Sequence, residues 1–294
     1  VDDLILNIQE QLMLKLPADE VDSHPSHSSF PGQVNATAPR PKITVNINGT
    51  FAGLPSQFGY ANARAAGRMA TGMYAPAGEV VNITIPQSMV NQGAAILVGA
   101  HSDSLWGKSS LSRHPKITRG WTMSNTSIQV ANAFGGPIYV TIPAGSAFGE
   151  FNITIENAVE MPRYIHGQTD INNWQNTIRN NSAPIAELES EWFILTVPSS
   201  YIRNLDYPNE TMDFWDDALQ MEHNLSGYTP WPRVERSVFD VQISAGWMHS
   251  GYPFMAHTAR VSGSGVCHTN WGIITSGCPQ LYQVLQKQLA IFIL

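Results

Sequence analysis

Beyond residue 42 the chain repeatedly alternates apolar with polar residues, and this period of two most constrains its fold. Residues 43–48 place Ile and Val between Thr and Asn, and residues 81–85 repeat the pattern. Such runs predict β-strands with one buried face, because successive side chains point to opposite sides of a strand. Further apolar runs bounded by turn residues occur at 95–98, 138–142, 151–155 and 192–197. Strands of this length and spacing predict a β-sandwich over residues 42–165.

The first 41 residues carry a different pattern. Apolar residues recur near every 3.6 positions in residues 1–16 and predict a short amphipathic helix that packs on another part of the protein. They are Leu4, Ile5, Ile8, Leu12 and Leu16. Residues 17–41 are rich in Pro, Ser, His and Ala and have no period, so we expect a linker there. A domain boundary near residue 40 follows.

Helices are predicted again in the later part of the chain. Asp170 can cap a helix that begins at Ile171, because its side chain can accept from the first free amides. Thr211 can cap a second helix over residues 212–225. This mixture of helix and strand indicates a second domain over residues 166–274. The fold class that we predict is therefore α+β.

Charge is sparse and evenly distributed. Only 13% of the residues are charged, the formal net charge is −7, and Lys and Arg form no run. A phosphate backbone needs a concentrated basic surface, so the sequence argues against nucleic acid as a partner. No stretch reaches the ~20 apolar residues of a membrane-spanning helix, so we expect no membrane span.

Asparagine is common and often lies in an Asn-x-Ser/Thr sequon. Eight of the 20 asparagines do so. The sequons predict N-glycosylation and a secreted or extracellular location, although an Asn-rich and Thr-rich β protein also produces them by composition alone. The candidate sites are Asn35, Asn48, Asn82, Asn125, Asn152, Asn180, Asn209 and Asn224.

Neither the histidines nor the carboxylates form a recognisable catalytic or metal-binding motif. Two histidines lie in the expected linker, where we expect solvated side chains, since a site needs groups held on rigid elements. The spacing of His249, His257 and His268 matches no zinc signature. No residue after Asp240 can supply a carboxylate as a general base or ligand. The residues therefore predict no catalytic residue, no metal and no cofactor in this chain.

Residues 242–253 group large and hydrogen-bonding side chains around glycines. Trp247, His249 and Tyr252 stand out, and the glycines permit close backbone approach. This composition suits a cleft in which these three side chains bind substrate. A buried strand end with an aromatic plug explains the same residues equally well, and the sequence leaves both interpretations open.

Five segments, taken in order, resemble the enhancin-type, mucin-targeting zinc metallopeptidases of peptidase family M60. They are Thr71–Glu79, Phe134–Tyr139, Ala186–Ser190, Phe214–Asp216 and Asp240–Pro253. The resemblance extends from about residue 65 to residue 274, and its last segment is the most specific. It implies a β-sandwich that leads into a zinc-dependent domain cleaving glycoproteins. In the family, a His-Glu-x-x-His helix and a later Glu bind the zinc.

The family's zinc-binding helix directly follows a Trp-Gly segment, which this chain has at residues 271–272. Thr275 and Pro279 then stand where the two His ligands would be, and Ser276 stands where the catalytic Glu would be. Thr and Ser are poor zinc ligands beside imidazole, and a proline disrupts the helix. Residues 275–294 do not resemble the family, which predicts a chain truncated before the motif.

These observations predict an α+β protein with a β-sandwich, the opening part of a mixed α/β metallopeptidase domain and a non-family tail. We expect a zinc metallopeptidase family member related to enzymes that act on mucin-like glycoproteins. This chain itself is expected to be inactive and to lack the zinc that full-length relatives bind. The alternative is a non-catalytic module that binds a glycan or glycoprotein through the sandwich and residues 247–252.

Overall fold

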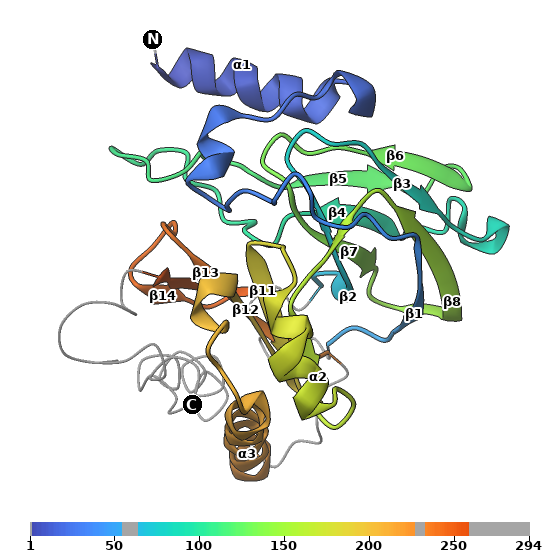
Figure 1. Cartoon of the computed structure of the whole chain (residues 1–294), viewed down its shortest axis with the longest axis vertical. Coiled ribbons are helices and arrows are strands. Elements are labelled where there is room, and N and C mark those ends of the chain that lie inside the picture. Colours follow the sequence, from blue (N-terminus) through green and yellow to red (C-terminus); the bar gives the residue numbers. More distant parts are fainter. Residues whose placement is uncertain (1, 55–63, 227–232, 259–294) are drawn as a thin grey trace. The chain divides into compact units, whose positions relative to one another are not determined.

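The computed structural model describes residues 2–54, 64–226 and 233–258 (Figure 1). The chain divides into two compact units, each with its own apolar core. The first unit comprises residues 1–52, 66–162 and 181–185, and the second comprises residues 53–65, 163–180 and 186–294. Three sheets and a few helices make up the described residues, which confirms the α+β class.

The first unit contains two antiparallel sheets that form a β-sandwich. One sheet has the strand order β1-β8-β3-β6 and the other has the order β5-β4-β7-β2-β9. The strands of the first sheet are β1 (Ile43–Phe51), β8 (Ser146–Glu156), β3 (Val81–Thr84) and β6 (Ser127–Val130). Those of the second are β5 (Arg119–Thr122), β4 (Ala95–Val98), β7 (Gly136–Ile142), β2 (Gly67–Ala75) and β9 (Val159–Glu160).

Apolar side chains from both sheets share one core. Ile83 and Ile153 of one sheet belong to the same buried cluster as Ile96 and Val140 of the other. The alternation of the sequence thus places one face of each sheet inward, and the predicted sandwich is confirmed. It ends with β9 rather than at residue 165, because the following strand belongs to a different sheet.

The N-terminal helix is present as α1 (Asp2–Lys15), but its packing differs from our expectation. Leu4, with 65% of its surface exposed, and the three apolar residues that follow it on this face are all exposed. The helix instead buries the side that carries Glu10 and Met13. Glu10 accepts a hydrogen bond of 2.7 Å from the Trp106 indole, which fixes this choice of face.

Residues 17–41, expected to be a linker, are ordered and partly buried. They form 3-10 turns at Ala18–Glu20 and Pro25–Ser28, and they belong to the first unit. The His24 amide donates to the Ala133 carbonyl at 2.8 Å, and the His24 ring lies 4.8 Å from that of Phe134. The contacts that order these residues are with residues distant in sequence, so the local composition gives no sign of them and indicates only a linker.

The second unit is built on a six-stranded sheet covered on one face by helices. Its strand order is β10-β11-β12-β13-β15-β14. The strands are β10 (Arg163–Ile165), β11 (Ile185–Glu189), β12 (Phe193–Pro198), β13 (Glu235–Asp240), β15 (Phe254–His257) and β14 (Met248–His249). Phe193 and Leu195 of this sheet share a core with Trp174 and Trp215 of the helices.

The two predicted helices of this unit are α2 (Ile171–Asn176) and α3 (Pro208–Ser226). Asp170 caps α2 as expected and accepts from the Asn173 amide at 2.8 Å. Thr211 does not cap α3, because the helix begins at Pro208 and Thr211 is fully buried inside it. Proline suits the first turn of a helix, where its missing N–H needs no partner. None of the helices in the described ranges is long and apolar enough to cross a membrane.

The docking of residues 17–41 predicts a loss of stability in acid. Burial lowers the pKa of His24 from 6.5, as does the nearby His114, whose own pKa burial also lowers. The two rings lie 5.6 Å apart beside Phe134, with Glu10 and Arg113 also acting on His114. The unfolded chain therefore binds more protons, so the free energy of unfolding should fall as the pH drops through 6.5 and below.

This dependence can be measured by urea unfolding between about pH 7.5 and pH 5. His24→Phe keeps a ring against Phe134 but cannot be protonated, so the variant should lose less stability in acid than the parent. Equal slopes in the two proteins would contradict this role for His24.

Candidate functional site

The segment predicted to form a cleft, residues 242–253, lies at one end of the six-stranded sheet and within the last family-like segment, Asp240–Pro253. The chain leaves β13 at Asp240, whose side chain accepts from the Gln242 amide at 3.1 Å and begins the turn. It then forms β14, the last strand in the sheet order, which pairs antiparallel with β15. Gly246, at a φ of 58°, turns the chain just before β14 in a conformation that side chains disfavour. The segment is thus held between two core strands.

Trp247 is the most exposed aromatic side chain of this segment. Its surface is 46% exposed, whereas most tryptophans of the described chain are buried or partly buried. The ring packs edge to face against His257 at a centroid distance of 5.2 Å, and the Trp247 carbonyl accepts from the His257 amide at 2.9 Å. The tryptophan is therefore held in place from the β15 side while part of its surface meets solvent.

His249 is held by both of its ring nitrogens. Nδ1 lies 3.0 Å from the Ser250 carbonyl oxygen, and Nε2 lies 3.3 Å from the Ser244 hydroxyl. A carbonyl can only accept, so Nδ1 carries a proton, and Nε2 can accept from the Ser244 hydroxyl when the ring is neutral. This arrangement fixes the orientation of the imidazole and leaves it partly exposed.

Tyr252 lies inside the unit rather than at the surface. It is only 7% exposed, and the Arg233 guanidinium lies 4.0 Å from its ring centre. Arg233 in turn donates to Glu235 at 2.8 Å and 3.0 Å, and both charged side chains are buried. Burial raises the pKa of Glu235, and the ion pair with Arg233 opposes that rise. Tyr252 is therefore a support of the segment, while Trp247 and His249 face outward.

Trp247 and His249 are thus partly exposed, whereas Tyr252 is buried as the aromatic-plug interpretation expects. Substrate binding by these three residues stays a prediction. The contact with Arg233 distinguishes Tyr252 from the other two residues. Arg233 lies against the Tyr252 ring but is 19 positions earlier in the sequence. A single sequence gives no indication of that contact.

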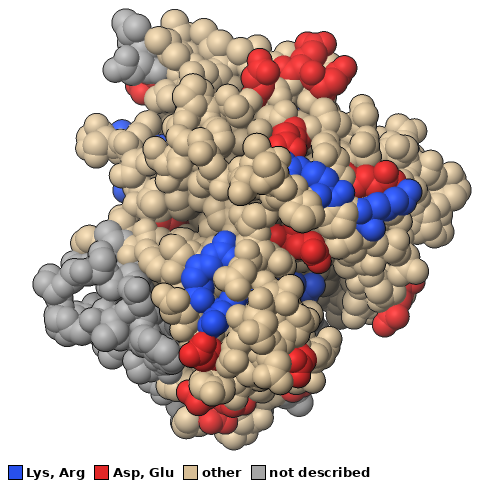
Figure 2. All heavy atoms as spheres, viewed as in Figure 1, with Lys and Arg blue, Asp and Glu red and all other residues tan. Residues whose placement is uncertain are grey.

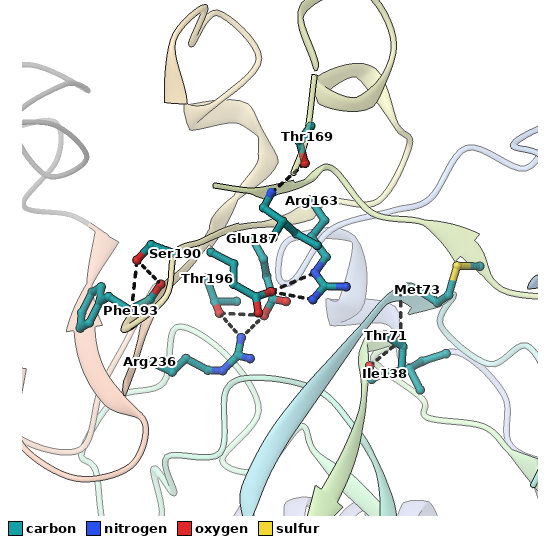
Figure 3. Close-up of polar contacts among 12 residues, drawn as sticks. Thr71, Met73, Ile138, Arg163, Thr169, Glu187, Ser190, Phe193, Thr196 and Arg236 are labelled. Carbon is teal, nitrogen blue, oxygen red and sulfur yellow. Dashed lines mark hydrogen bonds and ion pairs between the residues drawn. The ribbon is translucent and has the colours of Figure 1, made fainter. Parts of the chain in front are cut away.

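A fully buried ion pair crosses the middle of the same sheet (Figure 3). Arg236 of β13 donates to Glu187 of β11 and, at 3.0 Å, to the hydroxyl of Thr196 on β12. Thr196 also donates to Glu187 at 3.0 Å. The three polar groups lie on three neighbouring strands and are joined to one another by hydrogen bonds. Sequence reasoning found no part of this network, because its members are up to 49 positions apart.

Further polar contacts fix α3 and β10 to the sheet region. The Ser190 hydroxyl donates to Asp216 of α3 at 2.6 Å and accepts from the Phe193 amide at 3.2 Å, the latter drawn in Figure 3. Burial raises the pKa of Asp216, and the bond from Ser190 opposes the rise. On the same helix, Asp213 lies 2.9 Å from Nε2 of His166. These carboxylates are engaged in structural contacts.

No group of three His, Cys, Asp or Glu side chains in the described part of the chain could hold a metal ion. His249 and His257 lie near β14 and β15, but His268 and the positions 275, 276 and 279 fall outside the described residues. Residues 267–294, which include both cysteines and the expected tail, fall outside them too.

The surface of the described chain is poor in charge. On the face shown in Figure 2, uncharged surface predominates, and basic and acidic groups lie scattered on it. Seven of the eight sequon asparagines are exposed, and the eighth, Asn209, is partly buried. Exposure permits modification of these asparagines, which remains a prediction.

Two family profiles match the chain in succession. Residues 36–156 match the N-terminal domain of M60-like peptidases, and residues 157–274 match the profile described as peptidase M60, enhancin and enhancin-like. Their border at residues 156 and 157 falls at the end of β8, close to where the first unit ends. The outward-facing Trp247 and His249 lie within the second match.

The chain is also similar to curated proteins and to solved structures. The chain is 39% identical over 195 residues to TRPM8 channel-associated factor 2 of Bos taurus, an alignment that covers 66% of this chain and 21% of that protein. The catalytic module of the metalloprotease ZmpA from Clostridium perfringens shares the fold, with a TM-score of 0.57, 15% identity and coverage of 74% of this chain and 49% of that one.

A third match is the M60 catalytic domain of Clostridium perfringens ZmpC, solved in complex with the sialyl T antigen. Its TM-score is 0.57 at 12% identity, and the match covers 74% of this chain and 48% of that one. At such identity the likeness concerns the fold alone. The chain spans about a fifth of the length of the first curated relative and about half of the two solved chains.

The buried Glu187–Arg236 pair predicts a strongly non-additive effect of substitution. Glu187→Leu or Arg236→Met alone leaves an uncompensated buried charge and should lower the free energy of unfolding by about 3–5 kcal/mol. The double variant should recover most of that loss, since both charges are then gone. Urea unfolding of the parent, both single variants and the double variant measures the coupling.

The exposed pair of Lys42 and Glu156, 2.8 Å apart, provides the matched control. The same cycle with Lys42→Met and Glu156→Leu should give a coupling of at most about 1 kcal/mol, because solvent screens that pair. A coupling at Glu187 and Arg236 no larger than the surface value would refute the assigned role.

Proposed function

The chain belongs to the peptidase M60 family of enhancin and enhancin-like proteins, and from this premise we propose that it is a non-catalytic member that recognises glycoproteins. The recognition surface that we propose is centred on Trp247 and His249 at β14. The observation that carries the proposal is the half-exposed Trp247 ring, 46% exposed on a segment otherwise anchored in the core.

The first support for a non-catalytic role is the donor set of the chain. A zinc centre of this family needs two imidazoles and a carboxylate, with a further carboxylate as general base. Thr275, Ser276 and Pro279 occupy the corresponding positions of the sequence. These residues do not fit zinc, so we derive no step that uses the metal.

The second support is the chemistry of the exposed ring. A tryptophan face offers an apolar surface to the C–H face of a sugar or to an apolar side chain. The neighbouring His249 ring is fixed by its contacts with Ser244 and Ser250 and is partly exposed. A few fixed polar groups beside an apolar surface are typical of ligand sites. Tyr252, stacked on Arg233 at 4.0 Å, holds the segment from beneath.

The comparisons suggest the class of ligand. A protein of the same fold was solved with the sialyl T antigen, and the curated relative is named for association with a channel rather than for catalysis. Both favour recognition of a protein or its glycans for this chain. We also propose that the protein is extracellular, where the exposed sequon asparagines could be glycosylated.

The absence of zinc chemistry is directly testable. The purified 294-residue chain, prepared without chelator, should contain less than stoichiometric zinc and should not cleave mucin. The Clostridium perfringens ZmpA catalytic module, treated in parallel, provides the positive control for the assay. One tightly held zinc per chain, or mucin cleavage by the pure chain, would refute the non-catalytic assignment.

The recognition surface can be tested by binding to immobilised O-glycosylated mucin peptide and to the same peptide without glycans. Trp247→Ala should weaken binding by at least about tenfold, since exposed tryptophans that anchor a ligand commonly contribute that much. Thermal unfolding should be unchanged, because the ring is half-exposed.

Tyr207→Ala is the matched control, as Tyr207 is 51% exposed in the same unit but lies outside the segment. It should bind like the parent. Equal binding by Trp247→Ala and the parent would place the site elsewhere, and loss in both variants would indicate nonspecific adsorption through exposed rings.

A further inference from the structure

The first strand of the sandwich, β1, lies at an edge of its sheet and is long for an edge strand. It covers Ile43–Phe51, and within the described residues the only strand hydrogen-bonded to it is β8 (Figure 1). The opposite edge strand, β6, has four residues. A long edge strand presents a row of backbone groups that another strand can pair with.

Proteins usually protect such an edge with charge, proline or a bulge. Within β1 no residue is charged and none is proline. Lys42, just before the strand, is paired with Glu156 at 2.8 Å, and the register shift between Asn48 and Thr50 lies near the other end. Residues 43–48 are therefore a regular, uncharged and unprotected stretch.

The apolar side of this stretch is incompletely covered. Ile47 is 1% exposed, but Ile43 and Val45, which point to the same side, are only partly buried against the core. A further strand beside β1 would cover them. The polar side already makes ordered cross-strand pairs, since the Thr44 and Thr154 hydroxyls lie 3.0 Å apart and Asn46 donates to Asn152 at 3.1 Å.

From these observations we propose that β1 pairs with β1 of a second copy of this chain in an antiparallel two-fold dimer. Residues directly opposite in an antiparallel pair point to the same side, so a two-fold axis at residue 45 or 46 keeps Ile and Val inward. Thr44 and Asn46 then meet Thr or Asn of the partner, whose hydroxyls and amides both donate and accept. The two four-stranded sheets become one continuous sheet.

A second copy fits this edge better than an unrelated charged or proline-rich strand, because the chemistry of β1 is self-complementary on both faces. The contact is isologous, so it closes at two copies. It lies wholly within the first unit and does not depend on the proposed recognition by Trp247.

The test uses two charge-reversed variants of the full chain, Thr44→Lys/Asn46→Lys and Thr44→Glu/Asn46→Glu. Both positions are exposed, so each monomer should fold. Sedimentation equilibrium of the parent should show a monomer–dimer equilibrium. In each variant, like charges oppose each other across the two-fold axis, and the dissociation constant should rise by at least about tenfold.

Mixing the two variants in equal amounts should restore the dimer at low salt, because opposite charges then meet, and added salt should weaken the mixed dimer. Asn82→Lys/Thr84→Lys is the matched control, since both residues are exposed on the interior strand β3 of the same sheet. It should dimerise like the parent.

A parent that stays monomeric at all concentrations, or an oligomer that the variants at residues 44 and 46 do not change, overturns the proposal. Should those variants unfold, amide hydrogen exchange of the unmodified chain decides the question. Protection of β1 amides that increases with protein concentration supports the dimer, and protection independent of concentration overturns it.

Discussion

The contact between Arg236 and Glu187 constrains the second unit more than any other described interaction. Arg236 lies on β13, Glu187 on β11 and the bridging Thr196 on β12, so one network fixes three strands relative to one another. An ion pair in a protein interior gains little net stability, because two charges lose their water. Its effect is on specificity, since a shift of any of these strands by one residue would leave a charge buried alone. The strand that precedes the exposed Trp247 is β13, so the position of the candidate site depends on this register.

Local patterns in the sequence were sufficient for much of the fold. The alternation that predicts a strand is a property of six or seven adjacent residues, and every strand predicted from it is present. The sequence also predicts the N-terminal helix, but it does not predict which side of the helix is buried. That side is determined by the hydrogen bond between Glu10 and Trp106, which is 96 positions away. Likewise, residues 17–41 resemble a linker until the contact between His24 and Phe134 is known. Strands β2, β5 and β6 carry glycine, charge or few apolar residues, and their pairing with neighbours determines their conformation.

The candidate site, too, is only partly predicted by the local sequence. The composition of residues 242–253 predicts either a cleft or an aromatic plug, but it does not show which aromatic rings are buried and which are exposed. Tyr252 is buried because its ring stacks on the Arg233 guanidinium, whose buried charge is paired with Glu235. Trp247, by contrast, keeps 46% of its surface exposed. Tertiary contacts, rather than the local sequence, therefore determine that Tyr252 supports the segment and that Trp247 is exposed.

The contacts that position the strands of the second unit are separate from residues 275, 276 and 279, where the resemblance places the zinc ligands and the general base of the family. The ion network, the Ser190–Asp216 bond and the support of Tyr252 all lie between residues 187 and 252, upstream of the sequence in which the ligands would occur. Substitution of the ligand positions would therefore remove the chemistry while the register of β11, β12 and β13 is retained. In contrast, Glu187 and Arg236 can change only together, since either charge alone would destabilise the sheet. The contacts that hold this register do not include the zinc-ligand positions, so a family member without those ligands can keep the same strand arrangement.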